Sequence, residues 1–245
     1  MSDKVLSVFK ISKPIIGMLH LNGASDAKIH ELAKFEIEVL YKNGIDAILA
    51  ENYFGTAKDV EWALSYLRDN YSEKIYGVNI LGGTEIAFKL AAEFNAAFIQ
   101  VDSVCGHLAH DDDLKFAEDL NALRNSSNAF LLGGVRFKYQ PVNSGRALDE
   151  DLTLGKGRCD AVVVTGSGTG IGTKLEKIRE FKKFLQDFPL FVGAGMTDET
   201  CREQLAIADG AIVGSYFKHG GRDDEPISPE RVKRFMNIVN SFRLA

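Results

Sequence analysis

The sequence predicts an α/β fold, a single (β/α)8 TIM barrel that comprises residues 1–245, and three observations support this prediction. The length of 245 residues matches the size of about 250 residues that is usual for such a barrel. Apolar runs of strand type and helix-like segments alternate along the chain eight times. The last three runs lack polar alternation, which is typical of parallel strands that are buried on both faces.

The competing architecture is an open, doubly wound parallel sheet. Such a sheet normally carries its glycine-rich phosphate turn after the first strand. In this chain the first turn reads MLHLNGASD, with a single glycine, and the segment GSGTGIG at 166–172 lacks the GxGxxG spacing. Walker, HExxH and GxSxG motifs are also absent from the sequence, which excludes several common enzyme classes. The barrel is therefore the preferred prediction.

The first half of the chain contains four predicted strands, at 15–19, 47–50, 75–79 and 98–101. An amphipathic helix follows the first strand at about 27–43, and Gly44 ends it. After the third strand, Gly82-Gly83 form a turn and Thr84 is expected to cap the next helix. Each strand is thus followed by a helix, as the barrel requires.

The second half contains the fifth strand at 130–137, in which Gly133-Gly134 suggest a bulge. The sixth, seventh and eighth strands are predicted at 161–164, 190–192 and 211–213. Ser228-Pro229 begins the final helix, since a capping hydroxyl precedes a proline at the first helical position. The predicted buried stripe of this helix is Val232, Phe235, Met236, Val239 and Phe242. No linker or low-complexity tract divides the chain, so we expect one domain.

Charge and cysteine content limit the classes of partner. The net charge of −5 argues against nucleic acid as a partner. Three cysteines without CxxC pairing favour a reducing compartment. The N-terminus lacks the apolar stretch of a signal peptide, and no apolar run approaches the roughly 18 residues that span a bilayer. We therefore expect a cytoplasmic protein with no integral membrane segment, and a homo-oligomer is possible.

Glycine clusters after the last three strands suggest a phosphate site. In (β/α)8 barrels the loops after the last two strands commonly bind phosphate. Glycines allow the backbone to approach closely, and the amides at a helix N-terminus can face an anion. The alternative is that tight turns need glycine wherever φ is positive, whatever they bind. The predicted phosphate-binding residues are Gly166, Gly168, Gly193, Gly195, Gly214 and Ser215.

Polar residues stand at the carboxyl ends of the predicted strands, where barrel enzymes carry their active sites. A histidine, two carboxylates and a lysine are among them, and these groups serve proton transfer or imine chemistry. The strand-end residues are His20, Glu51, Asn52, Asn79, Asp102, Lys138, Thr165 and Ser215.

The two carboxylates have several possible roles. Glu51 is either a general base or a rim carboxylate paired with Lys138 or Arg136. Asp102 is an acid/base partner of Glu51, a ligand of Mg²⁺, or the cap of the following turn. The sequence leaves these alternatives open.

Arg136 and Lys138 are two residues apart, so they are expected to face the barrel mouth from the same side of the fifth strand. Two cations there would attract an anionic substrate. Lys138 is alternatively a Schiff-base amine, although nothing in the sequence indicates the lowered pKa that this role needs. His20 is either catalytic or a hydrogen-bonded structural residue.

Two further clusters of polar side chains have less specific spacing. One cluster follows the fourth strand and is either a metal site or a solvated loop before a helix; it comprises His107, His110 and Asp111. The other follows the eighth strand and is either a basic lid over a phosphate or a solvated loop; it comprises Lys218, His219 and Arg222.

With these residues in view, the chain resembles the BtpA/SgcQ family. The matching segments run nearly end to end and in order. They are KPIIGMLHL (13–21), GIDAILAENYFG (44–55), YGVNILGG (76–83), FIQVDSVCGHL (98–108), LGGVRFKYQPV (132–142), CDAVVVTGSGTG (159–170), FVGAGMTDE (191–199) and ADGAIVGSYFK (208–218). The resemblance implies a barrel of the ribulose-phosphate-binding type. It also places motif positions at His20, Glu51, Asn52, Asn79, Asp102, Gly193–Gly195 and Gly214-Ser215.

The chain departs from the family at one turn. Many members follow the first-strand His-Leu with a proline-rich PLPGSP-like turn, whereas this chain reads NGASDA. The cyanobacterial branch of the family is associated with photosystem I biogenesis, but FKYQPV in the fifth strand looks like a non-photosynthetic branch. The resemblance therefore implies a fold and a site without a defined reaction.

Two functions follow from these observations. The first is an isomerase, epimerase or aldolase-type lyase that acts on a small phosphorylated sugar or related metabolite. Its acid/base groups would be Glu51 and Asp102, with Lys138 and His20 polarising a carbonyl. No cofactor is expected, apart from the Mg²⁺ alternative at Asp102. The residues expected to bind the substrate are Asn52, Asn79, Arg136 and Thr165. The second function is a non-catalytic assembly factor that has kept the barrel.

Overall fold

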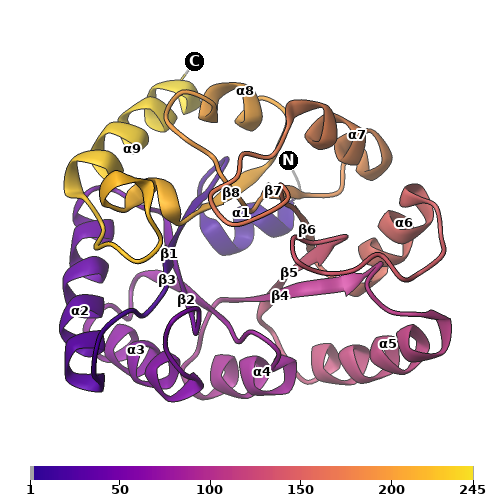
Figure 1. Ribbon diagram of the computed structural model, residues 1–245, viewed down its shortest axis with the longest axis horizontal. Coiled ribbons are helices and arrows are strands. Elements are labelled where there is room, and N and C mark those ends of the chain that lie inside the picture. The colour runs from indigo at the N-terminus through magenta and orange to yellow at the C-terminus, as the bar shows by residue number, and fades with distance from the viewer. Residues whose placement is uncertain (1–2, 245) are drawn as a thin grey trace.

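The structure is a computed structural model that describes residues 3–244. Eight parallel strands close into a barrel in chain order, and β8 pairs with β1 to complete the ring. Figure 1 shows α2 to α9 around the outside of this ring. The prediction of a (β/α)8 barrel is therefore confirmed.

The strands agree with the predicted ranges to within one residue, except at β4 and β5. Their bounds are β1 Ile15–Leu19, β2 Ala47–Glu51, β3 Ile75–Asn79, β4 Phe98–Cys105, β5 Phe130–Val135, β6 Ala161–Val164, β7 Leu190–Val192 and β8 Gly210–Val213. The strand β5 ends before Arg136, whose φ of 47° departs from the extended conformation. The strand β4 continues to Cys105 because its pairing with β5 resumes after a register shift.

The bulge expected at Gly133-Gly134 was assigned to the wrong strand. Both glycines pair regularly with β6, and the irregularity lies in β4 between Val101 and Cys105. A Cβ on Gly134 would lie 1.9 Å from the backbone oxygen of Asp102. Gly134 is therefore needed because the irregular strand beside it approaches so closely.

The helices cover the outside of the barrel. They are α2 Asp26–Lys42, α3 Ala57–Asn70, α4 Thr84–Glu93, α5 His110–Asn125, α6 Leu148–Arg158, α7 Leu175–Leu185, α8 Cys201–Leu205 and α9 Pro229–Arg243, with 3-10 turns η1 Ser215–Phe217 and η2 His219–Gly221 after β8. Among the described residues, no helix has the length and apolar character needed to cross a membrane.

Two helix ends test the capping predictions. Ser228 caps α9 as predicted, since its hydroxyl accepts a hydrogen bond from the Arg231 amide at 3.4 Å. Thr84 does not cap α4, because the helix already begins at Thr84 and Gly83 occupies the capping position without a side chain. The predicted stripe of α9 is buried except for Phe242, which is half-buried at the edge of the core.

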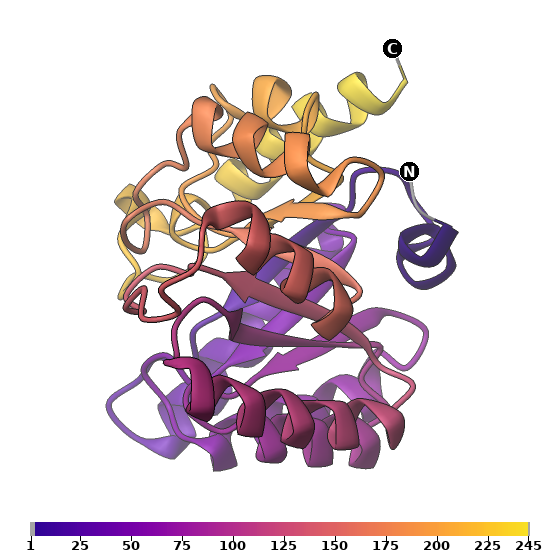
Figure 2. The ribbon, with the colours of Figure 1, turned by 90° about the vertical axis from the view of Figure 1, so that its right-hand side faces the viewer.

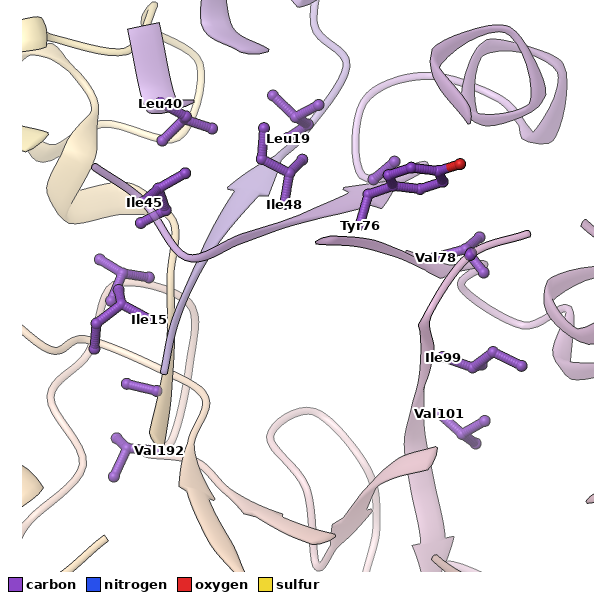
Figure 3. Close-up of a cluster of buried hydrophobic side chains, with 14 of the residues drawn as sticks. Ile15, Leu19, Leu40, Ile45, Ile48, Tyr76, Val78, Ile99, Val101 and Val192 are labelled. Atoms are coloured by element: carbon purple, nitrogen blue, oxygen red, sulfur yellow. The ribbon is translucent and has the colours of Figure 1, made fainter. Parts of the chain in front are cut away.

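The larger hydrophobic core lies between the strands and the outer helices. Figure 3 shows strand residues such as Ile48, Val78 and Ile99 pointing away from the barrel axis, toward the helices. Side chains such as Leu40 of α2 meet them from the other side. Because the inner residues of the same strands are apolar too, the strands show the continuous apolar runs from which the barrel was predicted.

A second, smaller core fills the barrel interior, and a helix absent from the sequence prediction closes it. This helix is α1, Asp3–Phe9, and Figure 2 shows it at one end of the barrel, apart from the surrounding helices. The ring of Phe9 lies with its centroid 5.4 Å from that of Phe98 and 5.9 Å from those of Phe130 and Phe191. Because Phe98 and Phe130 begin their strands, α1 closes the amino end of the barrel.

Candidate active site

The polar ends of the strands continue the rows of side chains that face the barrel interior. In β2, Ala47, Leu49 and Glu51 face inward because alternate residues of a strand point to the same side. The other strand ends follow the same alternation, and these residues gather at the carboxyl end of the barrel as predicted. The inward strand ends are His20, Glu51, Asn79, Asp102 and Thr165, and all but Asp102 are buried.

Asn79 joins the two carboxylates. Its side-chain nitrogen donates hydrogen bonds to Glu51 Oε1 at 2.7 Å and to Asp102 Oδ1 at 2.9 Å. Gln100, which the sequence analysis did not single out, donates to the same oxygen of Asp102 at 3.0 Å. We call Glu51, Asn79 and Asp102 the carboxylate bridge. It spans β2, β3 and β4 and sets the distance between the two candidate acid/base groups.

The surroundings of Glu51 suit proton transfer near neutral pH. The pKa of Glu51 is raised to about 7, first by burial and second by the negative charge of Asp102. The ammonium of Lys138 and the hydrogen bond from Asn79 oppose these effects. A carboxylate with this pKa can both accept and donate a proton at physiological pH.

His20 is neutral in this site. Burial lowers its pKa to about 3, and the positive charges of Lys218 and Lys138 act in the same direction. The imidazole lies 4.8 Å from the ring of Tyr53, and a Cβ on Gly214 would come within 3.1 Å of it. A neutral imidazole held this tightly can donate or accept one hydrogen bond, but it does not act as a charged acid.

Lys138 and Arg136 do not face the same way, so that prediction is wrong. Lys138 Nζ donates to Thr169 Oγ1 at 3.0 Å, inside the barrel mouth. Arg136 instead donates through Nε to Asp151 of α6 at 2.8 Å. The alternation of a strand does not extend to these residues, because β5 ends at Val135.

Asn52 and Thr165 hold loops in place. Asn52 Oδ1 accepts a hydrogen bond from the Leu81 amide at 2.7 Å, which ties the loop after β2 to the loop after β3. Thr165 Oγ1 accepts one from the Lys138 amide at 2.8 Å. Both side chains therefore have structural partners, and their predicted contacts with substrate stay predictions.

A small cavity lies among the loops after β7 and β8. We call it the glycine-lined cavity; it measures about 30 Å³, and Glu51, Lys138 and His20 form its other wall. Gly195 has a φ of 63°, and a Cβ there would lie 2.4 Å from the Gly172 amide nitrogen. The predicted phosphate-binding residues in its lining are Gly193, Gly195, Gly214 and Ser215.

Gly166 and Gly168 lie outside this lining. A Cβ on Gly166 would lie 2.5 Å from the Ile171 carbonyl oxygen, and one on Gly168 would lie 2.9 Å from the Tyr139 hydroxyl. Both glycines are therefore needed where other parts of the protein pack closely against them. Neither has a positive φ, so the turn geometry offered as the alternative to phosphate binding does not explain them.

Asp223 is a residue of the site that sequence reasoning missed. Its carboxylate accepts a hydrogen bond from the Ser215 hydroxyl, and its charge contributes to the raised pKa of Glu51. The residue lies in an acidic loop, GGRDDEP, that carries no recognisable motif. An anion that approaches Ser215 must therefore displace this carboxylate.

The cluster predicted as a basic lid is not one. Lys218 is fully buried, and its ammonium lies 3.0 Å from Glu36 of α2. Arg222 pairs with Asp224 at 2.8 Å. The residues of this loop are thus committed to contacts within the protein, and Lys218 anchors the loop after β8 to α2.

The cluster after β4 shows no metal site. Within residues 3–244, no group of three or more histidine, cysteine or acidic side chains is arranged to hold a metal ion. His107 packs edge-on against Phe116, and His110 and Asp111 lie in the first turn of α5. The Mg²⁺ alternative at Asp102 stays a prediction.

Comparison with known proteins identifies relatives of nearly the same length. A model of the BtpA family matches residues 11–241. An uncharacterised protein of Thermococcus kodakarensis is 30% identical in an alignment that covers 94% of this chain and 97% of that protein. The photosystem I biogenesis protein BtpA of Synechocystis is 26% identical, with 96% and 91% covered.

Solved structures share the barrel at lower identity. Thiamine phosphate pyrophosphorylase from Pyrococcus furiosus superposes with a TM-score of 0.62 at 16% identity, over 96% of this chain and 98% of that one. Phosphoribosyl anthranilate isomerase from Thermus thermophilus gives 0.58 at 14% identity, over 93% and 98%. At such identities the likeness shows the fold alone.

Proposed function

This chain belongs to the BtpA family, and we propose that it is an enzyme that acts on a small phosphorylated sugar or related metabolite. The reaction is an isomerisation, an epimerisation or an aldolase-type cleavage. The observation that carries the proposal is Glu51, a buried carboxylate whose pKa is raised to about 7 beside a neutral histidine and a lysine. These three reactions share one step, the removal of a proton next to a carbonyl group or its return.

In this mechanism Glu51 takes the proton from the carbon beside the carbonyl. The developing oxyanion is stabilised by the ammonium of Lys138 and by an N–H of the neutral imidazole of His20, both of which line the same cavity as Glu51. Asp102 serves as the acid/base partner, held to Glu51 through Asn79. The carboxylate bridge keeps both groups in position during the transfer.

The phosphate of the substrate would lie in the glycine-lined cavity. Gly193, Gly195 and Gly214 line this cavity without side chains of their own, so an anion can approach the backbone there. In the structure Asp223 holds Ser215, and the cavity measures only about 30 Å³. Binding therefore requires that the loop carrying Asp223 moves away from Ser215. The phosphorylated substrate, the cytoplasmic location and a homo-oligomer all stay predictions.

The experiment is proton exchange in deuterated water. The protein is incubated with a panel of aldose and ketose monophosphates, and deuterium incorporation beside the carbonyl is followed by NMR. We expect exchange with at least one compound, and a loss of about 100-fold or more in Glu51→Gln. The matched control is Glu61→Gln, an exposed carboxylate on α3.

Two outcomes would count against the proposal. Undiminished exchange in Glu51→Gln would remove Glu51 as the base. No exchange with any monophosphate, together with no thermal stabilisation by any of them, would contradict the proposal that the chain is an enzyme of this kind.

A non-catalytic assembly factor is the second candidate. The photosystem I biogenesis protein among the relatives favours it, at 26% identity over nearly the whole chain. The raised pKa of the buried Glu51 argues against it, because a scaffold has no need of a carboxylate that is costly to bury. Co-purification of a stoichiometric protein partner, without exchange on any metabolite, would support this candidate.

A further inference from the structure

A second cavity adjoins the carboxylate bridge on the side of Asp102. It measures about 170 Å³ and lies between the loop after β3, the end of β4 and the loop after β4. It shares no lining residue with the glycine-lined cavity. Asn79 separates the two, since its side chain bonds to Glu51 in the wall of one cavity and to Asp102 in the wall of the other.

Two buried polar atoms at the second cavity have no hydrogen-bond partner among the described residues: Gln100 Oε1 and His107 Nδ1. Gln100 is only 3% exposed. Its amide nitrogen must face the carboxylate of Asp102, to which it donates at 3.0 Å, so its oxygen is turned away from that bond. A buried acceptor without a partner is unfavourable, and a ligand that donates a hydrogen bond there relieves this.

Both hydrogen-bond donors and acceptors line this cavity. Gln100 Oε1 and the carboxylate of Asp102 accept hydrogen bonds. Thr84, the first residue of α4, offers a hydroxyl and a backbone amide that has no partner within the helix. Burial lowers the pKa of His107, so its imidazole is neutral and offers one donor and one acceptor.

These hydrogen-bonding groups favour a hydroxyl group over a phosphate as the ligand of the second cavity. A hydroxyl group both donates and accepts, so it can bond to Gln100 Oε1 and to Thr84 together. A second phosphate would meet the carboxylate of Asp102 and the Gln100 oxygen, which repel it. The rings and methyl groups of Phe116 and Ile80 provide an apolar wall for a carbon chain.

We infer that the second cavity binds the neutral, hydroxyl-bearing end of the substrate, which therefore carries a phosphate at one end only. This inference rests on the proposed function, in which the glycine-lined cavity takes the phosphate. The reacting carbon then lies between the two cavities, beside the carboxylate bridge. The substrate class is a polyhydroxylated monophosphate with several carbons between its two ends.

The test uses unreactive polyol phosphates, which have no carbonyl group. Binding of inorganic phosphate, glycerol phosphate, ribitol monophosphate and ribitol bisphosphate is measured by calorimetry. We expect ribitol monophosphate to bind at least tenfold more tightly than inorganic phosphate, and the bisphosphate to lose that gain. His107→Phe should weaken ribitol monophosphate by about tenfold and leave inorganic phosphate unchanged.

The control variant is His30→Phe, which alters a histidine stacked on Trp62 on the outer surface of the barrel. Thr84→Val provides a second variant of the cavity if His107→Phe does not fold, and a loss of severalfold is expected for it. Inorganic phosphate that binds as tightly as every polyol phosphate would overturn the inference and leave the proposed function standing. Tighter binding of ribitol bisphosphate than of ribitol monophosphate would also overturn the inference alone. No binding of any phosphate compound would overturn both the inference and the proposed function.

Discussion

The two ends of the barrel are built from the same strands and the same inward alternation, yet their contents are opposite. The amino end is apolar, with Phe9 of α1 packed on Phe98, Phe130 and Phe191. The carboxyl end is polar, and Glu51 lies buried there with a pKa near 7. Burial of apolar surface stabilises the fold, whereas burial of a carboxylate costs free energy. The comparison indicates that the amino end stabilises the fold, whereas the buried carboxylate at the carboxyl end reduces its stability.

The largest expected effect is at the amino end. Phe9→Ala removes a fully packed ring and should lower the free energy of unfolding by about 3–5 kcal/mol, as measured by urea denaturation. Phe184→Ala on α7 is the matched control, because that ring is 38% exposed, and its effect should stay below about 1 kcal/mol. Equal losses in the two variants would show that α1 does not contribute to the core of the barrel.

At the carboxyl end, removal of the charge on Glu51 should stabilise the protein, whereas removal of the Phe9 ring at the amino end destabilises it. The pKa of Glu51 is about 7 in the folded protein and 4.5 in a free side chain, so the folded state holds the proton more tightly. The resulting stabilisation is complete below pH 4.5 and is lost as the pH rises through 7. Relative to Glu51→Gln, whose side chain still accepts from Asn79, the wild type should lose about 3 kcal/mol between pH 4.5 and 8.

Urea denaturation of both proteins across this pH range measures the difference. Glu61→Gln again serves as the control, since its side chain is exposed on α3. A difference between wild type and Glu51→Gln that stays constant with pH would mean that Glu51 is not costly to bury, and the contrast between the two ends would disappear.

The smallest effect is expected where a polar group at the carboxyl end is fully paired. Thr165→Val removes the acceptor for the Lys138 amide at 2.8 Å and should cost about 1–2 kcal/mol. Thr153→Val on the exposed face of α6 is the control, and its effect should be near zero. A stabilising Thr165→Val would mean that even the paired polar groups of this end reduce stability.

Much of the fold could be predicted from the sequence because each strand carries its own signal. Apolar runs that end in glycine or polar residues located all eight strands of the barrel. The helix α1 was missed because it is only seven residues long. Val5, Val8 and Phe9 have helical spacing, but so short a pattern does not identify a helix, and its contacts are with residues spread over the whole chain. Thr84 failed as a cap because the helix begins one residue earlier than a side-chain cap would require.

Predictions about the site failed where a local rule ended. The rule that residues two apart face the same way holds only within a strand, and Arg136 lies beyond the end of β5. The sequence placed Lys218 in a basic lid or a solvated loop, but the residue is buried and pairs with Glu36. Nothing in the neighbouring sequence of Lys218 indicates a partner on α2, because that contact forms only when the barrel closes.

The sequence by itself determined which residues stand at the ends of the strands, since chain order and alternation are local properties. It thereby placed Glu51, Asn79 and Asp102 at one end of the barrel. Only the tertiary structure decided that Asn79 bridges the two carboxylates, that Asp223 holds Ser215, and that a second cavity opens beside Asp102. These features depend on the register between neighbouring strands and on the exclusion of water from the barrel mouth. The same exclusion raises the pKa of Glu51, and no local pattern of residues encodes it.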